Sequence, residues 1–134
     1  MFERRKPAPQ KRIDSLIGAG TTVRGDVLFA GGLRIDGTVQ GNVATADGQT
    51  GTLVVSEQAR IEGRVSVSHV VVNGTVNGPI VARDYLELQG KARVDGDVTY
   101  RTLEMQVGAV VEGRLGHAEP GTAEVVELKR AAAD

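Results

Sequence analysis

The chain has 134 residues, enough for one domain of ordinary size, and a formal net charge of −1. It has no cysteine, which excludes disulfides and cysteine-ligated metals, and its two histidines are too few for a carbonic-anhydrase-type zinc site of three imidazoles. Aromatic residues make up 3% of the chain, so a core must be built from aliphatic side chains, and no apolar run approaches the roughly 18 residues of a membrane span.

The first segment, residues 1–14, is predicted to be a flexible basic arm. Residues 1–12 contain five basic side chains and one acidic one, a net charge of +4, with two prolines and no apolar periodicity. No apolar run follows the cations, so the segment is not a secretory signal, and we expect a cytoplasmic protein. An apolar tip beside cations suits an anionic cytoplasmic membrane leaflet. The predicted membrane-binding residues are Met1, Phe2, Arg4, Arg5 and Lys6.

The second segment, residues 15–116, repeats one seven-residue phrase six times. The phrase is a small residue followed, at every second position, by an aliphatic residue, a glycine and an aliphatic residue. The copies begin at Thr21, Gly37, Ala59, Gly74, Ala92 and Ala109, and their glycines lie 16, 22, 15, 18 and 17 residues apart. Such a period is typical of stacked copies of one supersecondary unit. The longest interval contains residues 44–52, which we expect to bulge out as a loop.

Each copy also carries a second apolar pair, such as Leu33-x-Ile35, so one period holds two or three short strands. A meander of hairpins would place Asn-Gly or Asp-Gly at its turns, but Asp36-Gly37 and Asn77-Gly78 lie inside the alternation. The sequence therefore predicts an all-β coil whose turns pair in parallel. This is a β-helix of about six turns and roughly 29 Å in length. We expect glycines and alanines on its inward face to allow close backbone approach across a narrow, triangular bore.

The two ends of this coil are predicted to associate with the ends of other copies of the chain. Soluble solenoids usually end in capping elements with a polar outer face, but the first and last copies here are as apolar as the middle ones. The end strands of a parallel coil also leave a row of backbone N–H and C=O groups that another chain can pair with. The predicted polymerisation residues are Ile17, Val23, Val27 and Phe29 at one end and Val107, Val110, Val111 and Leu115 at the other.

The third segment, residues 117–134, is predicted to be a flexible C-terminal tail. The stretch His117-Ala-Glu-Pro-Gly121 breaks the alternation, and an Ala/Glu-rich end follows it.

No motif for nucleotide or metal chemistry is found. The Gly90-Lys91 pair is followed by alanine, so it is not part of a phosphate-binding loop. Asp95, Asp97 and Glu112 share an outward strip, which we interpret as a solvated surface because no cation-binding loop accompanies it. We therefore expect no nucleotide, no metal, no cofactor and no enzymatic activity. The slightly acidic body also argues against a nucleic-acid partner.

Between residues 17 and 115 the order and spacing of the phrases resemble the bactofilins, a bacterial family of polymer-forming cytoskeletal proteins. The resemblance rests on the repeated V-x-G-x-V phrase, on Val72-Asn-Gly-Thr-Val-Asn-Gly-Pro-Ile80, and on Gly108-Ala-Val-Val-Glu-Gly-Arg-Leu115. It implies a right-handed, three-sided β-helix with flexible flanks that assembles end to end into nonpolar filaments without a nucleotide. It also implies membrane binding by the N-terminal flank.

The expected protein is therefore a cytoskeletal scaffold at the cytoplasmic face of the inner membrane. Its expected partners are other copies of itself, the anionic membrane surface, and cell-wall enzymes or other envelope proteins. The process that it serves stays open between cell shape, polarity and the anchoring of wall enzymes.

Two other classes compete with the structural polymer. A hexapeptide-repeat acyltransferase is also a β-helix, but its repeats run in sixes and it needs a catalytic histidine beside a cofactor cleft. A non-polymerising interaction module, like the β-helical domain of a division-site inhibitor, shares the fold and is the main alternative. Filament formation at moderate protein concentration distinguishes the polymer from this module, and acyl-CoA binding would favour the enzyme.

Overall fold

A computed structural model describes residues 13–118, and this part of the chain consists of sixteen short strands without a helix. The predicted membrane-binding residues of the arm, and the tail beyond Ala118, lie outside the described residues. The strands are β1 (Ser15–Ile17), β2 (Thr22–Arg24), β3 (Val27–Phe29), β4 (Gly31–Ile35), β5 (Thr38–Gln40), β6 (Val43–Thr45), β7 (Gly51–Val55), β8 (Arg60–Glu62), β9 (Val65–Val72), β10 (Thr75–Asn77), β11 (Ile80–Leu88), β12 (Arg93–Asp95), β13 (Val98–Tyr100), β14 (Leu103–Met105), β15 (Val110–Glu112) and β16 (Leu115–His117).

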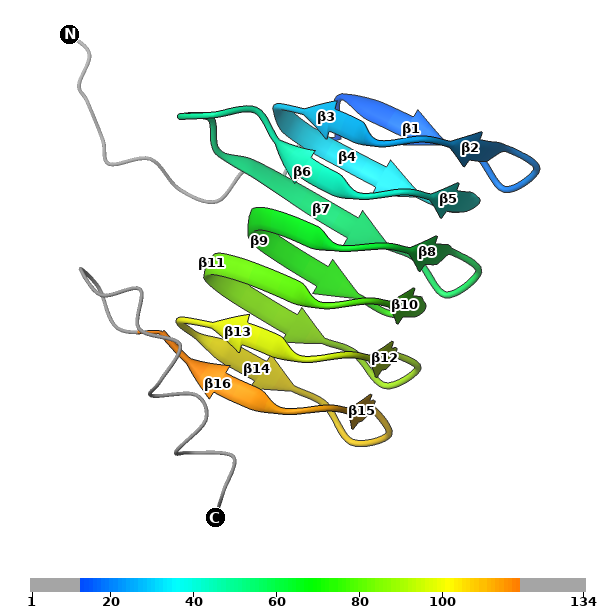
Figure 1. The fold of residues 1–134 in the computed structure, drawn as a ribbon. Helices are drawn as coiled ribbons and strands as arrows, with labels where there is room; N and C mark the ends of the chain where they lie inside the picture. The colour runs from blue at the N-terminus through cyan, green and yellow to red at the C-terminus, as the bar shows by residue number, and fades with distance from the viewer. Residues whose placement is uncertain (1–12, 119–134) are drawn as a thin grey trace, which may run out of the picture.

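The strands wind into a coil of six turns, and each turn adds one parallel strand to each of three faces (Figure 1). Face A contains β1, β4, β7, residues 69–72 of β9, residues 85–88 of β11, and β14. Face B contains β2, β5, β8, β10, β12 and β15. Face C contains β3, β6, residues 65–67 of β9, residues 80–82 of β11, β13 and β16. The prediction of an all-β parallel β-helix of about six turns is therefore confirmed.

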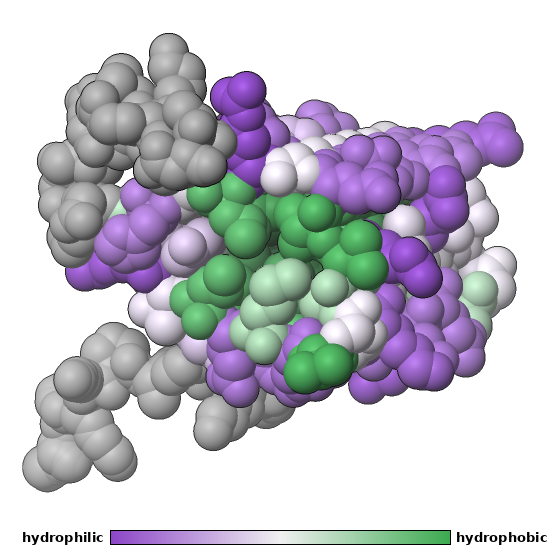
Figure 2. Space-filling view, turned by 90° about the horizontal axis from the view of Figure 1, so that it is seen from below, coloured by the Kyte–Doolittle hydropathy of each residue, from purple (hydrophilic) through white to green (hydrophobic). Residues whose placement is uncertain are grey.

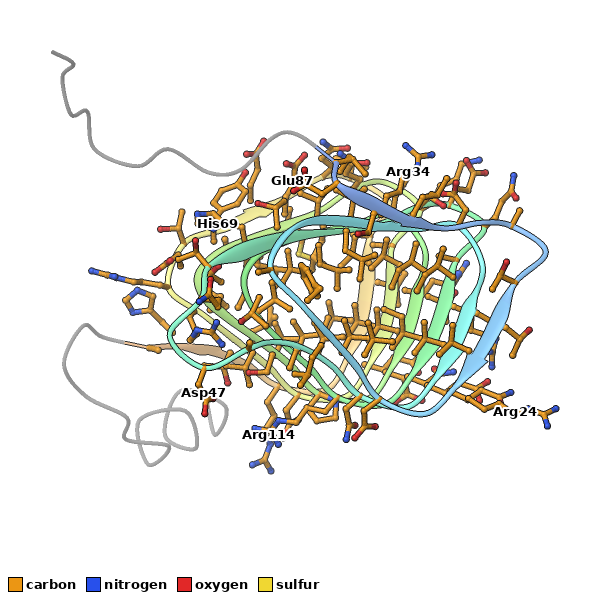
Figure 3. All side chains as sticks on the ribbon, turned by 90° about the horizontal axis from the view of Figure 1, so that it is seen from above. Arg24, Arg34, Asp47, His69, Glu87 and Arg114 are labelled. Atoms are coloured by element: carbon orange, nitrogen blue, oxygen red, sulfur yellow. The ribbon has the colours of Figure 1, made fainter. Side chains whose placement is uncertain are left out.

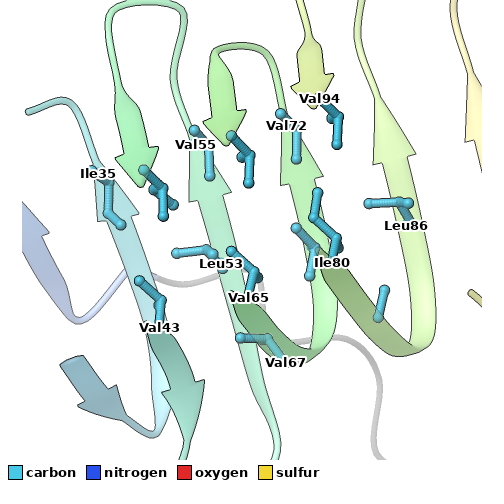
Figure 4. Close-up of a cluster of buried hydrophobic side chains, with 14 of the residues drawn as sticks. Ile35, Val43, Leu53, Val55, Val65, Val67, Val72, Ile80, Leu86 and Val94 are labelled. Atoms are coloured by element: carbon cyan, nitrogen blue, oxygen red, sulfur yellow. The ribbon is translucent and has the colours of Figure 1, made fainter. Parts of the chain in front are cut away.

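The aliphatic residues of the repeat stack in columns inside the coil. The column of face B is Val23, Val39, Ile61, Val76, Val94 and Val111. The column of face C is Val27, Val43, Val65, Ile80, Val98 and Leu115. In the middle turns these side chains are fully buried, as Ile61 and Ile80 show, and Figure 4 shows them meeting the side chains of face A. Burying one such side chain contributes about 1.5–3 kcal/mol, so each turn stabilises the next.

The glycines of the repeat lie at the corner between faces B and C. A Cβ added to Gly96 would lie 2.6 Å from the carbonyl carbon of Gly78 in the preceding turn. The backbone φ is 149° at Gly78 and 150° at Gly96, a region that residues with a side chain rarely adopt. The expectation that these glycines line the bore is therefore wrong, because a side chain here would project toward the backbone of the preceding turn. The glycines instead allow successive corners to stack closely along the rod. The alanines Ala59 and Ala92 are buried in the core, as expected.

The loop predicted at residues 44–52 is shorter than expected. Strands β6 and β7 extend into it, so that only residues 46–50 lie between strands. The buried Ser68 holds the loop's end, because its Oγ accepts a hydrogen bond from the Gly51 N–H (2.9 Å) and donates one to the Gly51 carbonyl oxygen (2.8 Å). The Arg83 guanidinium donates to Thr45 Oγ1 (2.7 Å) and binds the other end. The excursion is thus anchored to the following turns.

Candidate assembly surfaces at the two ends of the coil

The first and last turns each lack a neighbouring turn on one side. Strands β1, β2 and β3 pair only with β4, β5 and β6, and strands β14, β15 and β16 pair only with β11, β12 and β13, within residues 13–118. Every strand between them pairs on both edges, and β9 and β11 each run through a corner and so contribute to two faces. Each end of the rod therefore presents three strand edges to which no described strand is added.

At the N-terminal end the structure brings all four predicted polymerisation residues into one turn. Ile17 comes from β1, Val23 from β2, and both Val27 and Phe29 from β3. All four pack against the core but are only partly buried, whereas Val39, the next residue in the column of Val23, is 0% exposed. The difference has one cause: no further turn covers the first one.

At the C-terminal end the structure divides the four predicted residues into two pairs. Val111 and Leu115 continue the inner columns of faces B and C and pack against the core. Val110 pairs with Arg93 in an outward column of face B, and Val107 is 100% exposed in the corner between β14 and β15. The first pair forms the end surface itself, and the second pair lies at its rim.

Three further residues of the last turn belong to the C-terminal end surface. Leu103 and Ala109 are partly buried against the core, and Met105, which follows Leu88 in an inner column of face A, is 43% exposed. Leu103 and Met105 form the second apolar pair of the last copy, as Leu33 and Ile35 do in an earlier one, so the sequence contained the signal. Viewed along the rod from this end, hydrophobic residues gather at the centre of the surface and hydrophilic ones surround them (Figure 2).

The sides of the rod are polar by contrast. Figure 3, a view along the rod, shows Arg24, Arg34, Glu87 and Arg114 projecting outward while aliphatic side chains fill the interior. Ion pairs on the sides are exposed, such as Arg60 Nε with Glu62 Oε2 at 2.8 Å, and such pairs contribute at most about 1 kcal/mol. The charged groups therefore keep the sides solvated and contribute little to folding.

One corner of the rod carries a ladder of side-chain hydrogen bonds. Asp26 Oδ1 accepts from the Asn42 N–H (2.9 Å), Asn42 Oδ1 accepts from the Arg64 N–H (2.9 Å), and Asp97 Oδ1 accepts from the Arg114 N–H (3.1 Å). Each bond joins one turn to the next beside the stacked glycines. Polar residues after the glycines thus satisfy backbone donors that the corner leaves outside the strand ladders.

Two side chains on face A and its neighbouring corner have shifted pKa values. Hydrogen bonding with Ser56, and secondarily the Arg34 guanidinium, lowers the pKa of Asp36. The hydroxyl of Tyr85 donates to Glu104 Oε1 (2.7 Å), and this bond raises the pKa of Tyr85 because it favours the neutral phenol. Both groups stay in their ordinary charge states at neutral pH, so neither is poised for proton transfer.

The acidic strip on face B is an open surface. Asp95 and Glu112 line a shallow depression of about 180 Å³ together with Arg93, Asn77 and Thr75. Within residues 13–118, no three acidic or histidine side chains are grouped closely enough to hold a metal ion. The same part of the chain has no helix that could span a membrane.

The described residues form a parallel β-helix whose first and last turns both leave their apolar columns partly exposed, and this architecture is a β-solenoid. Within that class, the chain belongs to the bactofilin family: the family described as "Bactofilin: Polymer-forming cytoskeletal" matches residues 15–116. This match confirms the resemblance seen in the repeated phrase.

Two proteins of Myxococcus xanthus (strain DK1622) are similar to the chain. Bactofilin BacO is 29% identical over 114 residues, which cover 85% of each protein. Bactofilin BacP is 31% identical over 110 residues, which cover 81% of this chain and 44% of BacP. No solved structure matches the chain.

Proposed function

We propose that this bactofilin is a cytoskeletal scaffold whose subunits stack end to end into filaments. The observation that carries the proposal is that, within residues 13–118, the apolar residues of the first and last turns are only partly buried and no further strand pairs with either turn. When two ends meet, the partly exposed columns of Val111 and Leu115, or of Val23 and Val27, become continuous with the columns of another subunit. Completing the burial of one such side chain contributes about 1 kcal/mol, and the strand edges gain backbone partners.

The filament is proposed to be nonpolar, with like ends joined about two-fold axes. A two-fold axis perpendicular to the rod keeps the handedness of the coil but reverses the direction in which the chain runs around it. The strands that meet across such a junction therefore run antiparallel. Antiparallel pairing is slightly more stable per residue than the parallel pairing that a head-to-tail junction would produce. Two-fold contacts between identical surfaces are also the commonest form of self-association.

Assembly is proposed to need neither nucleotide nor metal, and the protein is proposed not to be an enzyme. Support comes from the apolar character of the ends, because stacking buries hydrophobic surface and supplies the driving force directly. Membership in a polymer-forming cytoskeletal family agrees with a structural role. Purified protein in EDTA, without ATP or GTP, should therefore form filaments.

Substitutions at a single end test both stacking and polarity. Leu115→Arg places a charge at the C-terminal end, and Val23→Arg places one at the N-terminal end. In a nonpolar filament each variant keeps one intact kind of junction, so each should stop at dimers, and the double variant should be monomeric. In a head-to-tail filament every junction uses both ends, so either single variant would be monomeric.

Sedimentation and negative-stain images give the readout, and circular dichroism shows that the β-helix is intact. Thr38→Arg, which adds the same charge on the side of face B, is the matched control and should polymerise like the wild type. Filaments that persist in both end variants would place the stacking surface elsewhere. A wild-type protein that stays monomeric would favour the non-polymerising interaction module.

The filament is further proposed to lie at the cytoplasmic face of the inner membrane and to position cell-wall enzymes or other envelope proteins. The support is the sequence of the arm, in which Met1 and Phe2 precede Arg4, Arg5 and Lys6. Apolar tips beside cations bind anionic leaflets with about 1 kcal/mol per cation.

A further inference from the structure

Face A carries two carboxylates in its last two turns that no cation of residues 13–118 neutralises. One outward column of this face is Leu16, Arg34, Val54, Val71, Glu87 and Glu104. Arg34, the cation of this column, is already paired with Asp36 at 2.9 Å. Glu87 and Glu104 are register partners, and no ion pair among the described residues includes either of them. We call these two residues the face A acids.

Neutral hydrogen-bond donors hold the face A acids in place. The Tyr85 hydroxyl donates to Glu104 Oε1 (2.7 Å), and Gln89 Nε2 and Gln106 Nε2 both donate to Glu87 Oε2 (3.1 and 3.3 Å). These contacts orient the two carboxylates without compensating their charges. Like charges directly opposite one another on neighbouring strands are destabilising, so a cationic partner would stabilise this part of the face.

A buried hydroxyl on the same face also lacks a partner. Thr52 is 7% exposed, and its Oγ1 makes no hydrogen bond. Thr52 belongs to a second outward column of face A, which contains Gly32, Thr52, His69 and Tyr85. Leaving a buried hydroxyl unpaired is costly, so this orphaned group indicates a bound segment that supplies a donor or an acceptor.

The chain itself has a cationic segment that joins the rod at the head of this column. Asp14 stands directly before β1; its N–H donates to the Gly32 carbonyl oxygen (2.9 Å), and its Oδ2 accepts from the Gly32 N–H (3.0 Å). The point at which the preceding residues join face A is therefore fixed. Residues 1–12 have a net charge of +4, which is complementary to the face A acids.

We infer that residues 1–12 dock along face A of their own subunit, with their cluster of cations against the face A acids. The cluster consists of Arg4, Arg5 and Lys6. From Asp14 in the first turn to the acid in the sixth turn, five steps of about 4.8 Å make roughly 24 Å. The cations precede Asp14 by 8–10 positions and reach roughly 26–33 Å at about 3.3 Å per residue. The backbone between them crosses the middle turns, where it can bond Thr52.

Docking on the rod and binding to a membrane use the same cations, so one excludes the other in a given subunit. Face A thus holds the arm until an anionic leaflet competes for it. This consequence rests on the proposed membrane association, whereas the docking itself does not depend on it.

Disulfide trapping in the full-length chain tests the docking. The chain has no cysteine, so two introduced cysteines report a single contact. Ala8→Cys on the arm and Val71→Cys on face A should form a disulfide within one chain under mild oxidation. Ser66→Cys is the matched partner on face C, because it lies in the same strand on the other side of the corner at Ser68. An arm without a docking site would react with both positions at similar rates, whereas the docked arm should react several times faster with Val71→Cys.

Removing the face A acids should slow this disulfide. Glu87→Gln with Glu104→Gln keeps an acceptor for each neutral donor but removes both charges. One exposed ion pair multiplies a docked population by about 1.4–5, so losing two should slow the reaction at least about twofold. Raising the salt from about 0.1 M to about 1 M should also slow it, because the screening length falls from about 10 Å to about 3 Å. Asp95→Asn with Glu112→Gln, two register partners on face B, is the matched control and should leave the rate unchanged.

Equal rates at the two cysteine positions, or an unchanged rate after removal of the face A acids, would overturn the docking. Disulfides that join two chains, seen as dimers on a non-reducing gel, would assign the site to the arm of another subunit and overturn docking within one subunit. The monomeric background of Val23→Arg with Leu115→Arg should give the same rates. Absence of wild-type filaments would therefore overturn the proposed function and leave the docking intact.

Vesicle binding tests the competition with the membrane. Filaments without the face A acids should bind anionic vesicles at lower vesicle concentrations than filaments of Asp95→Asn with Glu112→Gln, which lose the same charge from face B. Equal binding by the two would overturn the competition.

Discussion

Single residues at the corner between faces B and C determine how closely the turns can stack. Gly63, Gly78 and Gly96 combine a positive φ with a carbonyl group of the preceding turn in the place where a side chain would project. The next position in several turns is an Asp or Asn, whose side chain accepts a hydrogen bond from the following turn. The recurring glycine is therefore required by the geometry of the corner.

The corner geometry predicts that Gly96→Ala is strongly destabilising. The new Cβ would meet the carbonyl group of Gly78, and alanine would be held at a φ that it rarely adopts, so the free energy of unfolding should fall by at least about 2 kcal/mol. Gly18→Ala is the control, because no atom lies within 4 Å of its added Cβ, and it should change stability by less than about 0.5 kcal/mol.

Urea unfolding followed by circular dichroism measures both variants in the background of Val23→Arg with Leu115→Arg, which should be monomeric, so that association does not contribute to the measured stability. A similar loss of stability in the two variants would mean that the close stacking at the corner is not what requires glycine.

At the scale of elements, strands of three to nine residues are stable here because each strand between the first and last turns is held between two neighbours and above a buried column. Irregular segments are attached to this framework by specific polar contacts. The segment of residues 46–50 is the largest excursion between strands of the described coil, and Ser68, in the turn that follows it, bonds both backbone groups of Gly51. A buried hydroxyl thus replaces ladder bonds that the excursion interrupts.

Removing this hydroxyl should therefore weaken the coil. Ser68→Ala leaves the buried Gly51 N–H without its acceptor, and such a loss typically costs about 1–3 kcal/mol. Ser66→Ala removes the same group two positions earlier, where it points outward and accepts a long, solvent-exposed hydrogen bond from Arg83 Nη1 (3.3 Å), and should cost less than about 0.5 kcal/mol. Chemical unfolding of both variants in the monomeric background of Val23→Arg with Leu115→Arg gives the comparison. Equal costs would contradict the assigned role of Ser68.

At the scale of the whole molecule, the described rod leaves apolar residues partly exposed in its first and last turns, so the proposed assembly should also affect its other interactions. One basic arm would bind a membrane weakly and in a salt-sensitive manner, because its cations act through screened attraction. A filament would present many arms at once, and multivalency can raise overall avidity by about 10²–10⁴. Membrane attachment should then require both the arm and the polymer.

Co-sedimentation with anionic vesicles tests this dependence. Wild-type filaments should pellet with the vesicles, whereas filaments with Phe2→Ala and with Arg4, Arg5 and Lys6 changed to Gln should stay in the supernatant after a low-speed spin. Changing Lys129 and Arg130 to Gln removes cations from the other end of the chain and should have little effect. The Leu115→Arg variant should bind far less than the polymer. Equal binding by that variant and by the polymer would refute the avidity argument.

The repeat by itself determined the architecture. Alternation assigns each residue of a strand to the inside or the outside, and a period of about 17 residues with glycine inside the alternation excludes hairpins. The inward columns and the apolar character of both ends follow from this pattern alone. They do so because a solenoid repeats one structural unit, so the assignment of residues to the inside or the outside in one turn applies to every turn.

Only the tertiary structure decided how the corners are built and which apolar residues lie at the ends. Sequence spacing does not reveal that the glycine approaches the preceding turn instead of the bore, because that contact joins residues 15–22 positions apart. It also does not distinguish Val111, which continues an inner column, from its neighbour Val110, which points outward beside Arg93. Alternation is a local property, whereas register between turns depends on corners of unequal length.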